Sequence, residues 1–216
     1  MQPPAPPRHQ TSTSNTKVLL LVFLGLFLMC GVGVGGIGLL AYFGMDSDEV
    51  ADEDVAESDR AMLVTFEDVA EYYELERTGG AGTFRKGGLL GSRELEYEYE
   101  DPGDGGIYLL SSVTRERTTK EARETYTAMQ LTMGVMLGMA GEGVTREERN
   151  DLFKWGDDSK HYLLTADGTA VGNFFITRKG KHVYFLSLGG VAFDDPETLS
   201  ELLTPRLERA VAWSPQ

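Results

Sequence analysis

Cysteine is almost absent from this 216-residue sequence, which contains only Cys30. A single cysteine forms no disulfide within the chain, so the small disulfide-stapled scaffolds of secreted proteins are excluded. Redox motifs of the Cys-x-x-Cys type are excluded as well, because they need a second cysteine. The fold must therefore be stabilised by packing and hydrogen bonding.

The sequence also lacks the short motifs that identify common enzyme classes. It contains no Gly-x-Ser-x-Gly, no His-Glu-x-x-His and no phosphate-binding Gly-x-x-x-x-Gly-Lys-Ser/Thr. His161 and His182, with Asp157 and Asp158 nearby, come closest to a metal site, but zinc needs three or four converging ligands. A histidine at the end of a strand is more often structural. We therefore predict no catalytic residue, no metal and no cofactor.

Basic residues are scarce, with 20 Lys and Arg against 34 Asp and Glu and a formal net charge of −14. Residues 1–17 carry +2 and residues 46–59 carry −8, which leaves −8 for residues 60–216. A nucleic-acid-binding surface needs a basic stripe, and none is visible in the sequence of residues 60–216. We therefore expect no nucleic-acid partner and no docking of these residues on anionic lipid head groups.

One long apolar run stands out against these absences, because residues 18–43 contain no charged side chain. A helix of this length would extend ~39 Å, more than the ~30 Å hydrocarbon core of a bilayer. The apolar region of a cleaved signal peptide is shorter, at ~7–15 residues. We predict that residues 18–43 form an uncleaved transmembrane helix, with a processed signal peptide as the alternative.

The flanks of this run predict its orientation. Basic residues precede it without any acidic residue, and residues 46–59 follow it with eight carboxylates and no base. Because basic flanks favour the cytoplasm, the C-terminal part is expected outside the cell membrane, in the periplasm or the extracellular space. The predicted organisation is a disordered cytoplasmic tail at 1–17, the span at 18–43, an acidic disordered linker at 44–59 that holds the domain off the bilayer, and an extracytoplasmic domain at 60–216.

Three glycines of the run, Gly31, Gly35 and Gly38, lie on one face of the predicted helix because they are spaced at i, i+4 and i+7. Such a face lets two membrane helices approach closely, which suggests a homodimer through the span. Glycine is also more frequent in membrane helices than in soluble ones, and this is the alternative interpretation.

Within residues 60–216 the clearest pattern is the alternation at residues 93–100. Leu95, Tyr97 and Tyr99 alternate with glutamates, which predicts a half-buried antiparallel strand with the glutamates on a solvated face. A Pro- and Gly-rich turn then predicts a hairpin with a second strand at residues 107–114. Further apolar runs, the last three separated by tight-turn signals, predict strands at residues 152–155, 161–165, 170–177 and 182–188, after a charged loop at 145–151.

A methionine-rich helix is expected after the hairpin. Thr118 and Glu121 have the spacing of a capping box, and the helix should end at Gly141. Its apolar stripe either packs on the sheet or forms an adaptable wall for an apolar ligand, since thioethers repack easily. The side chains of such a wall would be Tyr126, Met129, Met133 and Met136.

Two other segments also suggest helices. Asp195 and Pro196 have the sequence of a helix start, and Pro205 should kink or split the helix that follows. Residues 61–76 fit a helix capped by Ser58 or Asp59 that passes into a strand near Glu71.

Together these elements predict a domain of class α+β, in which an antiparallel sheet is covered by two main helices as an α–β–α or two-layer sandwich. The order hairpin, helix, meander, helix resembles that of the photosystem accessory protein PsbP and its relatives. This resemblance implies an α–β–α sandwich and no particular activity.

Three functions are compatible with these features. The first is a membrane-tethered, non-catalytic domain that binds a protein partner of the cell envelope. The second is a binder of an apolar small molecule or lipid, which exposed apolar area beside the methionine-rich helix would favour. The third, ranked last, is a hydrolase, which would need a deep pocket holding two carboxylates with raised pKa.

Overall fold

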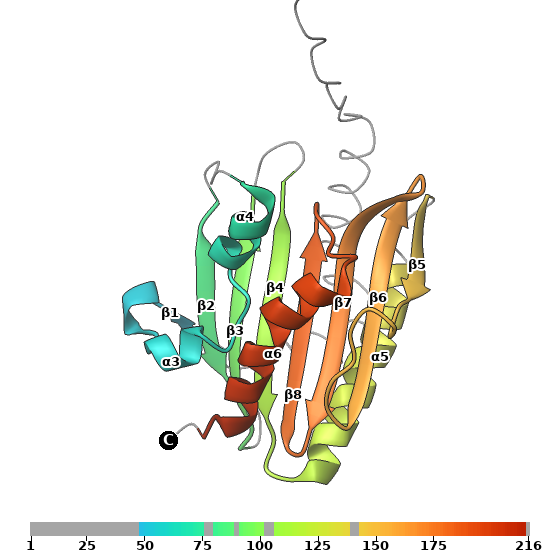
Figure 1. Cartoon of the computed structure of the whole chain (residues 1–216). Helices are drawn as coiled ribbons and strands as arrows, with labels where there is room; N and C mark the ends of the chain where they lie inside the picture. Colours follow the sequence, from blue (N-terminus) through green and yellow to red (C-terminus); the bar gives the residue numbers. More distant parts are fainter. Residues whose placement is uncertain (1–47, 76–79, 89–90, 102–105, 139–142, 215–216) are drawn as a thin grey trace, which may run out of the picture.

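The computed structural model describes residues 48–75, 80–88, 91–101, 106–138 and 143–214, without the side chains of residues 135–138 (Figure 1). These residues form one eight-stranded antiparallel sheet in the order β1-β2-β3-β4-β8-β7-β6-β5. The strands are Asp48–Val50 (β1), Gly82–Gly87 (β2), Arg93–Glu100 (β3), Tyr108–Arg115 (β4), Val144–Glu148 (β5), Asp158–Ala166 (β6), Thr169–Lys179 (β7) and His182–Gly189 (β8). The helices are Glu57–Arg60 (α3), Phe66–Tyr73 (α4), Thr119–Gly138 (α5) and Pro196–Ala212 (α6), with a 3-10 turn at Asp52–Asp54 (η1). The predicted class, α+β, is confirmed.

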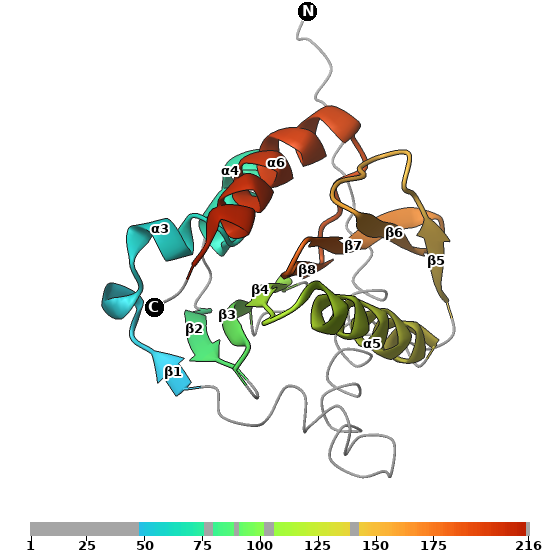
Figure 2. The same ribbon diagram turned by 90° about the horizontal axis from the view of Figure 1, so that it is seen from below.

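Helices cover both faces of the sheet. Figure 2 shows α4 and α6 on one side, which we call the α6 face, and α5 on the other, which we call the α5 face. The larger core lies under α4 and α6 and includes Leu63, Tyr99, Phe175 and Leu203. The smaller core lies under α5 and includes Met129, Ile176 and Val183. The domain is thus an α–β–α sandwich with two separate cores.

The hairpin predicted from the alternation is confirmed. β3 and β4 pair antiparallel, with Tyr97 opposite Ser111. Leu95, Tyr97 and Tyr99 are buried in the larger core, so the intervening glutamates point to the α5 face. The predicted meander is also confirmed, because β6, β7 and β8 pair in chain order.

Residues 48–59, predicted to belong to a disordered linker, are instead ordered, and the prediction is wrong for this stretch. They form β1, η1 and α3. β1 pairs with β2, and Val55, 5% exposed, packs in the larger core. Arg60 Nη1 lies 2.7 Å from Asp52 Oδ1. A buried apolar side chain, strand pairing and this ion pair hold the acidic stretch on the domain in spite of its charge.

The segment before residue 76 contains a helix, α4, but no strand near Glu71. Glu74 adopts a left-handed conformation with φ 51° and ends the helix. The cap is Thr65, whose backbone N donates to Asp68 Oδ2 at 2.8 Å, and not the predicted Ser58 or Asp59. Tyr72 and Tyr73, which follow Glu71, lie on this helix, and Tyr73 OH donates to the Ala192 carbonyl at 2.7 Å.

Besides β1, two more strands are not visible in the sequence pattern. β5 falls within the predicted charged loop, because an edge strand exposes its side chains and tolerates charge. β2 begins and ends with glycine and buries only Phe84. Conversely, residues 152–155 are not a strand. They form a loop in which Leu152 and Phe153 fill the larger core.

Both main helices begin where the sequence predicts. At the start of α5, Glu121 N donates to Thr118 Oγ1 and Thr118 N donates to Glu121 Oε2, both at 3.1 Å. At the start of α6, Thr198 N donates to Asp195 Oδ2 at 2.7 Å. α6 continues through Pro205 to Ala212, so this proline does not split the helix.

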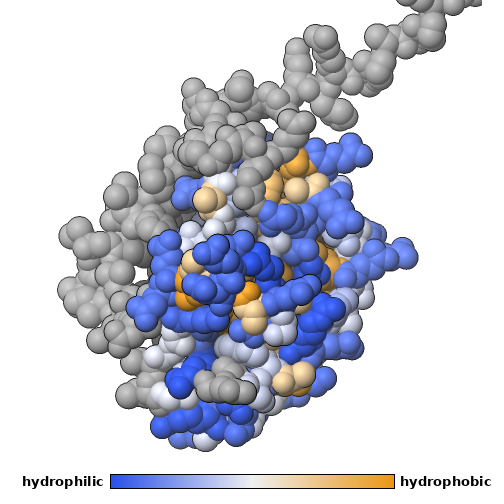
Figure 3. All heavy atoms as spheres, turned by 90° about the vertical axis from the view of Figure 1, so that its left-hand side faces the viewer, coloured by the Kyte–Doolittle hydropathy of each residue, from blue (hydrophilic) through white to orange (hydrophobic). Residues whose placement is uncertain are grey.

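Both edges of the sheet carry short, charged strands. β1 begins with Asp48 and Glu49, and β5 ends with Glu147 and Glu148, all of them exposed. Charged edge strands resist pairing with another sheet. Figure 3, which views the molecule from the β1 side, shows a mostly hydrophilic surface with small, separate apolar areas.

Among the helices that the structure describes, none has the length and apolar character needed to cross a membrane. The predicted span at residues 18–43, with Gly31, Gly35 and Gly38, lies outside the described residues.

Candidate functional site

The methionine-rich helix α5 packs on the sheet. Tyr126, Met129 and Met133 are 7%, 4% and 3% exposed. They belong to the smaller core, together with Phe174, Ile176 and Phe185 of the sheet. The side chain of Met136 lies outside the described residues. The interpretation that the helix packs on the sheet therefore fits this structure. A wall for an apolar ligand would require these three side chains to leave their contacts in the smaller core.

The two candidate metal-ligand histidines are held apart by β7, which pairs with both β6 and β8. His182 Nε2 donates to the Trp213 carbonyl at 3.1 Å. Within the described residues, no three side chains of the His, Cys, Asp and Glu types are grouped as metal ligands. The structure therefore does not bring His161, His182, Asp157 and Asp158 together.

His161 is fully buried and fastens two loops to the sheet. Its Nδ1 donates to the Arg149 carbonyl at 3.2 Å, and its Nε2 accepts from Asn173 Nδ2 at 3.1 Å. Asn173 also donates to the Phe193 carbonyl at 2.8 Å and accepts from Phe193 N at 2.6 Å. Burial lowers the pKa of His161 to about 4, so the ring is neutral at pH 7. This network is structural.

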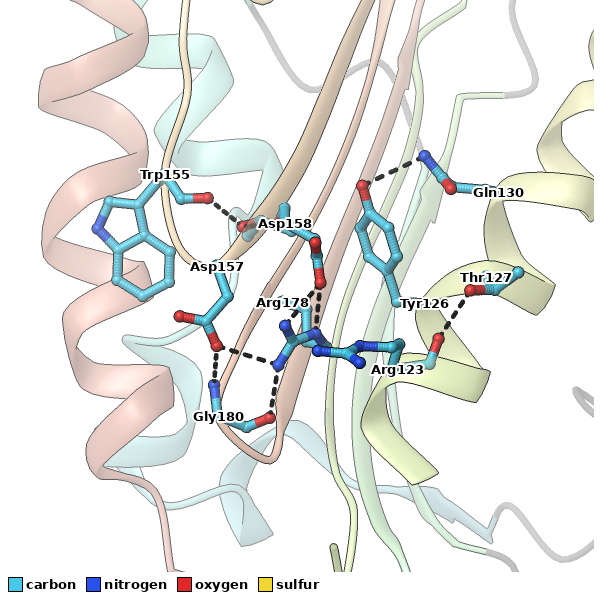
Figure 4. Close-up of polar contacts among 10 residues, drawn as sticks. Arg123, Tyr126, Thr127, Gln130, Trp155, Asp157, Asp158, Arg178 and Gly180 are labelled. Carbon is cyan, nitrogen blue, oxygen red and sulfur yellow. Dashed lines mark hydrogen bonds and ion pairs between the residues drawn. The ribbon is translucent and has the colours of Figure 1, made fainter. Parts of the chain in front are cut away.

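Arg178 is at the centre of a polar cluster beside α5 (Figure 4). Its side chain is 3% exposed, with Nη1 3.0 Å from Asp157 Oδ2 and Nη2 2.6 Å from Asp158 Oδ2. Nη1 also donates to the Gly180 carbonyl at 3.1 Å, and Gly180 N donates to Asp157 Oδ2 at 2.9 Å. The guanidinium thus ties the loop before β6 to the turn between β7 and β8.

The α5 side of this cluster is lined by polar side chains (Figure 4). Gln130 Nε2 donates to Tyr126 OH at 3.2 Å. Burial and the charge of Asp158 raise the pKa of Tyr126 to about 12. The hydrogen bond from Gly180 N and the charge of Arg178 lower the pKa of Asp157. Because the charges of Arg178 and its two aspartates are paired with one another, the cluster is a structural clamp.

The α5 face of the sheet is only partly covered. α5 contacts β7 and β8, whereas no described helix lies over β2, β3 and β4 on this side (Figure 2). We call this area the open half-face. It carries an ion-pair network in which Arg85 Nη1 lies 3.1 Å from Glu96 Oε1 and 2.7 Å from Glu98 Oε2.

Two further titratable groups of the open half-face have shifted pKa values. Burial, and then the neighbouring Glu96, raise the pKa of Glu94 to about 7, while a hydrogen bond of 3.4 Å from Thr114 Oγ1 opposes the shift. Burial and the charge of Glu98 raise the pKa of Tyr108 above its usual range. Of the glutamates predicted as a solvated sheet surface, Glu94, Glu96 and Glu98 are therefore half-buried and interact with their neighbours, whereas Glu100 is exposed.

The alternation at residues 93–100 was the signal for this surface, and it places the glutamates on one face. It does not contain Arg85, because β2 has no recognisable pattern of its own. The role of Arg178 is likewise invisible in the sequence, since its partners lie 20 and 21 residues away.

Comparisons of the chain with protein families, with curated proteins and with solved structures find no match.

Proposed function

We propose that this chain is a single-pass membrane protein that presents a non-catalytic interaction domain outside the cell membrane. In this proposal residues 18–43 span the bilayer and residues 1–17 stay in the cytoplasm. The folded domain then faces the periplasm or the extracellular space. Gly31, Gly35 and Gly38 offer a face for a homodimer within the span.

The observation that carries the proposal is the order of elements along the chain. A charge-free run of 26 residues ends at Phe43, and only residues 44–47 separate it from β1 of a sheet with two cores of its own. A domain with its own cores folds as an independent unit. The apolar run is therefore not needed to complete these cores and is long enough to serve as an anchor.

We assign the open half-face to a protein partner. Its glutamates outnumber the one guanidinium of Arg85, so a complementary partner would present Lys and Arg. Leu110, which is partly buried, adds an apolar contact beside these charges. A partner bound here would continue the layer that α5 begins.

A photo-crosslinking amino acid at Thr83, which pairs in register with Glu98, tests this assignment in native membranes. We expect one discrete adduct, and we expect the double variant Glu96→Gln/Glu98→Gln to lose most of it because the charge attraction is removed. The matched control is Glu197→Gln/Glu201→Gln, which removes the same charge from exposed positions of α6. Adducts that are equally strong in both double variants would contradict the assignment.

A further inference from the structure

A second charged surface lies at one end of the sheet, and this one is basic. Register pairs Arg93 of β3 with Arg115 of β4, Arg115 with His182 of β8, and His182 with Lys179 of β7. Because neighbouring strands lie about 4.8 Å apart, these four side chains form a lateral row on the α6 face. With Lys181 in the β7–β8 turn, we call them the cationic row.

Within the described residues, most charges of this row are not paired with an acid; the exception is Lys179, whose charge helps to lower the pKa of Asp157. Arg93 donates to the Ser92 carbonyl at 3.3 Å, but Arg93, Arg115 and Lys181 form no ion pair with any residue in the described part of the chain. Burial lowers the pKa of His182, and the charges of Arg115 and Lys181 lower it further, so these cations converge on the ring. Unneutralised cations side by side on a chain of net charge −14 point to an anionic partner.

Both tryptophans of the chain lie at this same end. Lys179 Nζ lies 4.7 Å from the ring centroid of Trp155, and the Trp213 carbonyl accepts the hydrogen bond of His182. In Figure 1 the β7–β8 turn, the end of β4 and the carboxyl end of α6 lie together at the lower end of the sheet. Tryptophan beside Lys and Arg is the composition that proteins use at the membrane–water interface.

The chain also enters the domain at this end. Asp48, the first residue of β1, pairs with Lys86, and Lys86 pairs with Leu95, two positions from Arg93. Residues 44–47 connect Asp48 to Phe43, where the proposed span ends. The five steps from Phe43 to Asp48 reach at most ~17 Å. So short a tether keeps the cationic end of the sheet beside the bilayer.

We propose that the cationic row docks on anionic phospholipid head groups of the leaflet in which the span ends. The proposal rests on the membrane anchor proposed above and adds which end of the domain faces the lipid. Charge complementarity and tether length support the same partner. The net charge of residues 60–216 argues against lipid docking only if the charges are mixed evenly. Register instead gathers basic side chains at one end.

The two tryptophans provide the test, because both report on the docked end. The full chain is reconstituted in nanodiscs of phosphatidylcholine with or without phosphatidylglycerol, each carrying a nitroxide on a fraction of the lipid head groups. We expect tryptophan quenching at least about twofold stronger with the anionic lipid, and loss of this difference in high salt. Arg93→Gln/Arg115→Gln should abolish the difference. Arg146→Gln/Lys160→Gln, which removes two charges on β5 and β6, should keep it.

Quenching that is equal in the two lipids, or that is unaffected by salt and by Arg93→Gln/Arg115→Gln, would overturn the docking. The anchor is tested separately by alkaline extraction of the full chain from liposomes made of the same lipids. A chain that alkali releases has no membrane span, and the proposed function itself then fails.

Discussion

Acidification from pH 7 to pH 4 is expected to destabilise the wild-type protein by about 3 kcal/mol more than the His161→Gln variant. The pKa of buried His161 is lowered from 6.5 to about 4. Above pH 6.5 the ring is neutral in both the folded and the unfolded chain, so its contribution to stability is fully present. As the pH falls toward 4, the unfolded chain binds a proton that the folded chain excludes, and this stability is lost.

Urea unfolding of both proteins at a series of pH values measures this difference. The comparison with the variant is needed because Glu94, with its pKa raised to about 7, gains a proton more easily in the folded chain and therefore acts in the opposite direction. At pH 7 the variant should be the less stable protein, since it loses the bonds to Arg149 and Asn173. The difference in free energy of unfolding between the two proteins should become smaller as the pH falls toward 4. A gap independent of pH would show that the ring is not held neutral by burial.

Replacement of Arg178 by methionine is expected to lower the free energy of unfolding by about 3 kcal/mol, because it removes one partner of an enclosed ion-pair cluster. The substitution leaves Asp157 and Asp158 without their cation and frees the Gly180 carbonyl. Both aspartates are partly exposed, so water solvates them after the substitution. We therefore expect a loss of unfolding free energy at the lower end of the range for broken buried ion pairs.

The matched control is Arg146→Met on the exposed edge strand β5. Arg146 lies 5.7 Å from the ring centroid of Tyr162, and the loss of this contact should cost less than about 1 kcal/mol. Chemical unfolding of both variants decides the matter. If Arg178→Met is no more destabilising than Arg146→Met, the cluster does not clamp the β7–β8 turn.

The parts of the fold that could be predicted are those in which local pattern and burial agree. Leu95, Tyr97 and Tyr99 alternate because one face of β3 is buried, and the Thr118–Glu121 capping box is complete within four residues of sequence. Such features need no knowledge of the distant chain. The hairpin, the meander and both main helices follow from signals of this kind.

The remaining features depend on tertiary contacts that sequence spacing does not contain. β5 has the composition of a loop because its side chains are exposed, and residues 48–59 have that of a disordered linker although Val55 is buried. The cationic row exists only because register brings together Arg93, Arg115 and Lys179 from three different strands. No linear pattern marks these residues as neighbours.

The ordering of residues 48–59 also changes how the domain is held. A disordered linker would let the domain stand away from the proposed span, whereas β1 starts five residues after Phe43. If the proposed span anchors the chain, the sheet therefore starts close to the bilayer surface.

The membrane anchor is tested most directly by the reactivity of Cys30, the only cysteine of the chain. A water-soluble maleimide should leave Cys30 unlabelled in native membranes, even in concentrated urea that unfolds the outer domain, because lipid excludes the reagent and disfavours the reactive thiolate. A Thr83→Cys substitution in the domain should be labelled in the same urea, and Cys30 should react only after detergent dissolves the bilayer. Full labelling of Cys30 in urea without detergent would contradict the membrane anchor, and with it the docking of the cationic row.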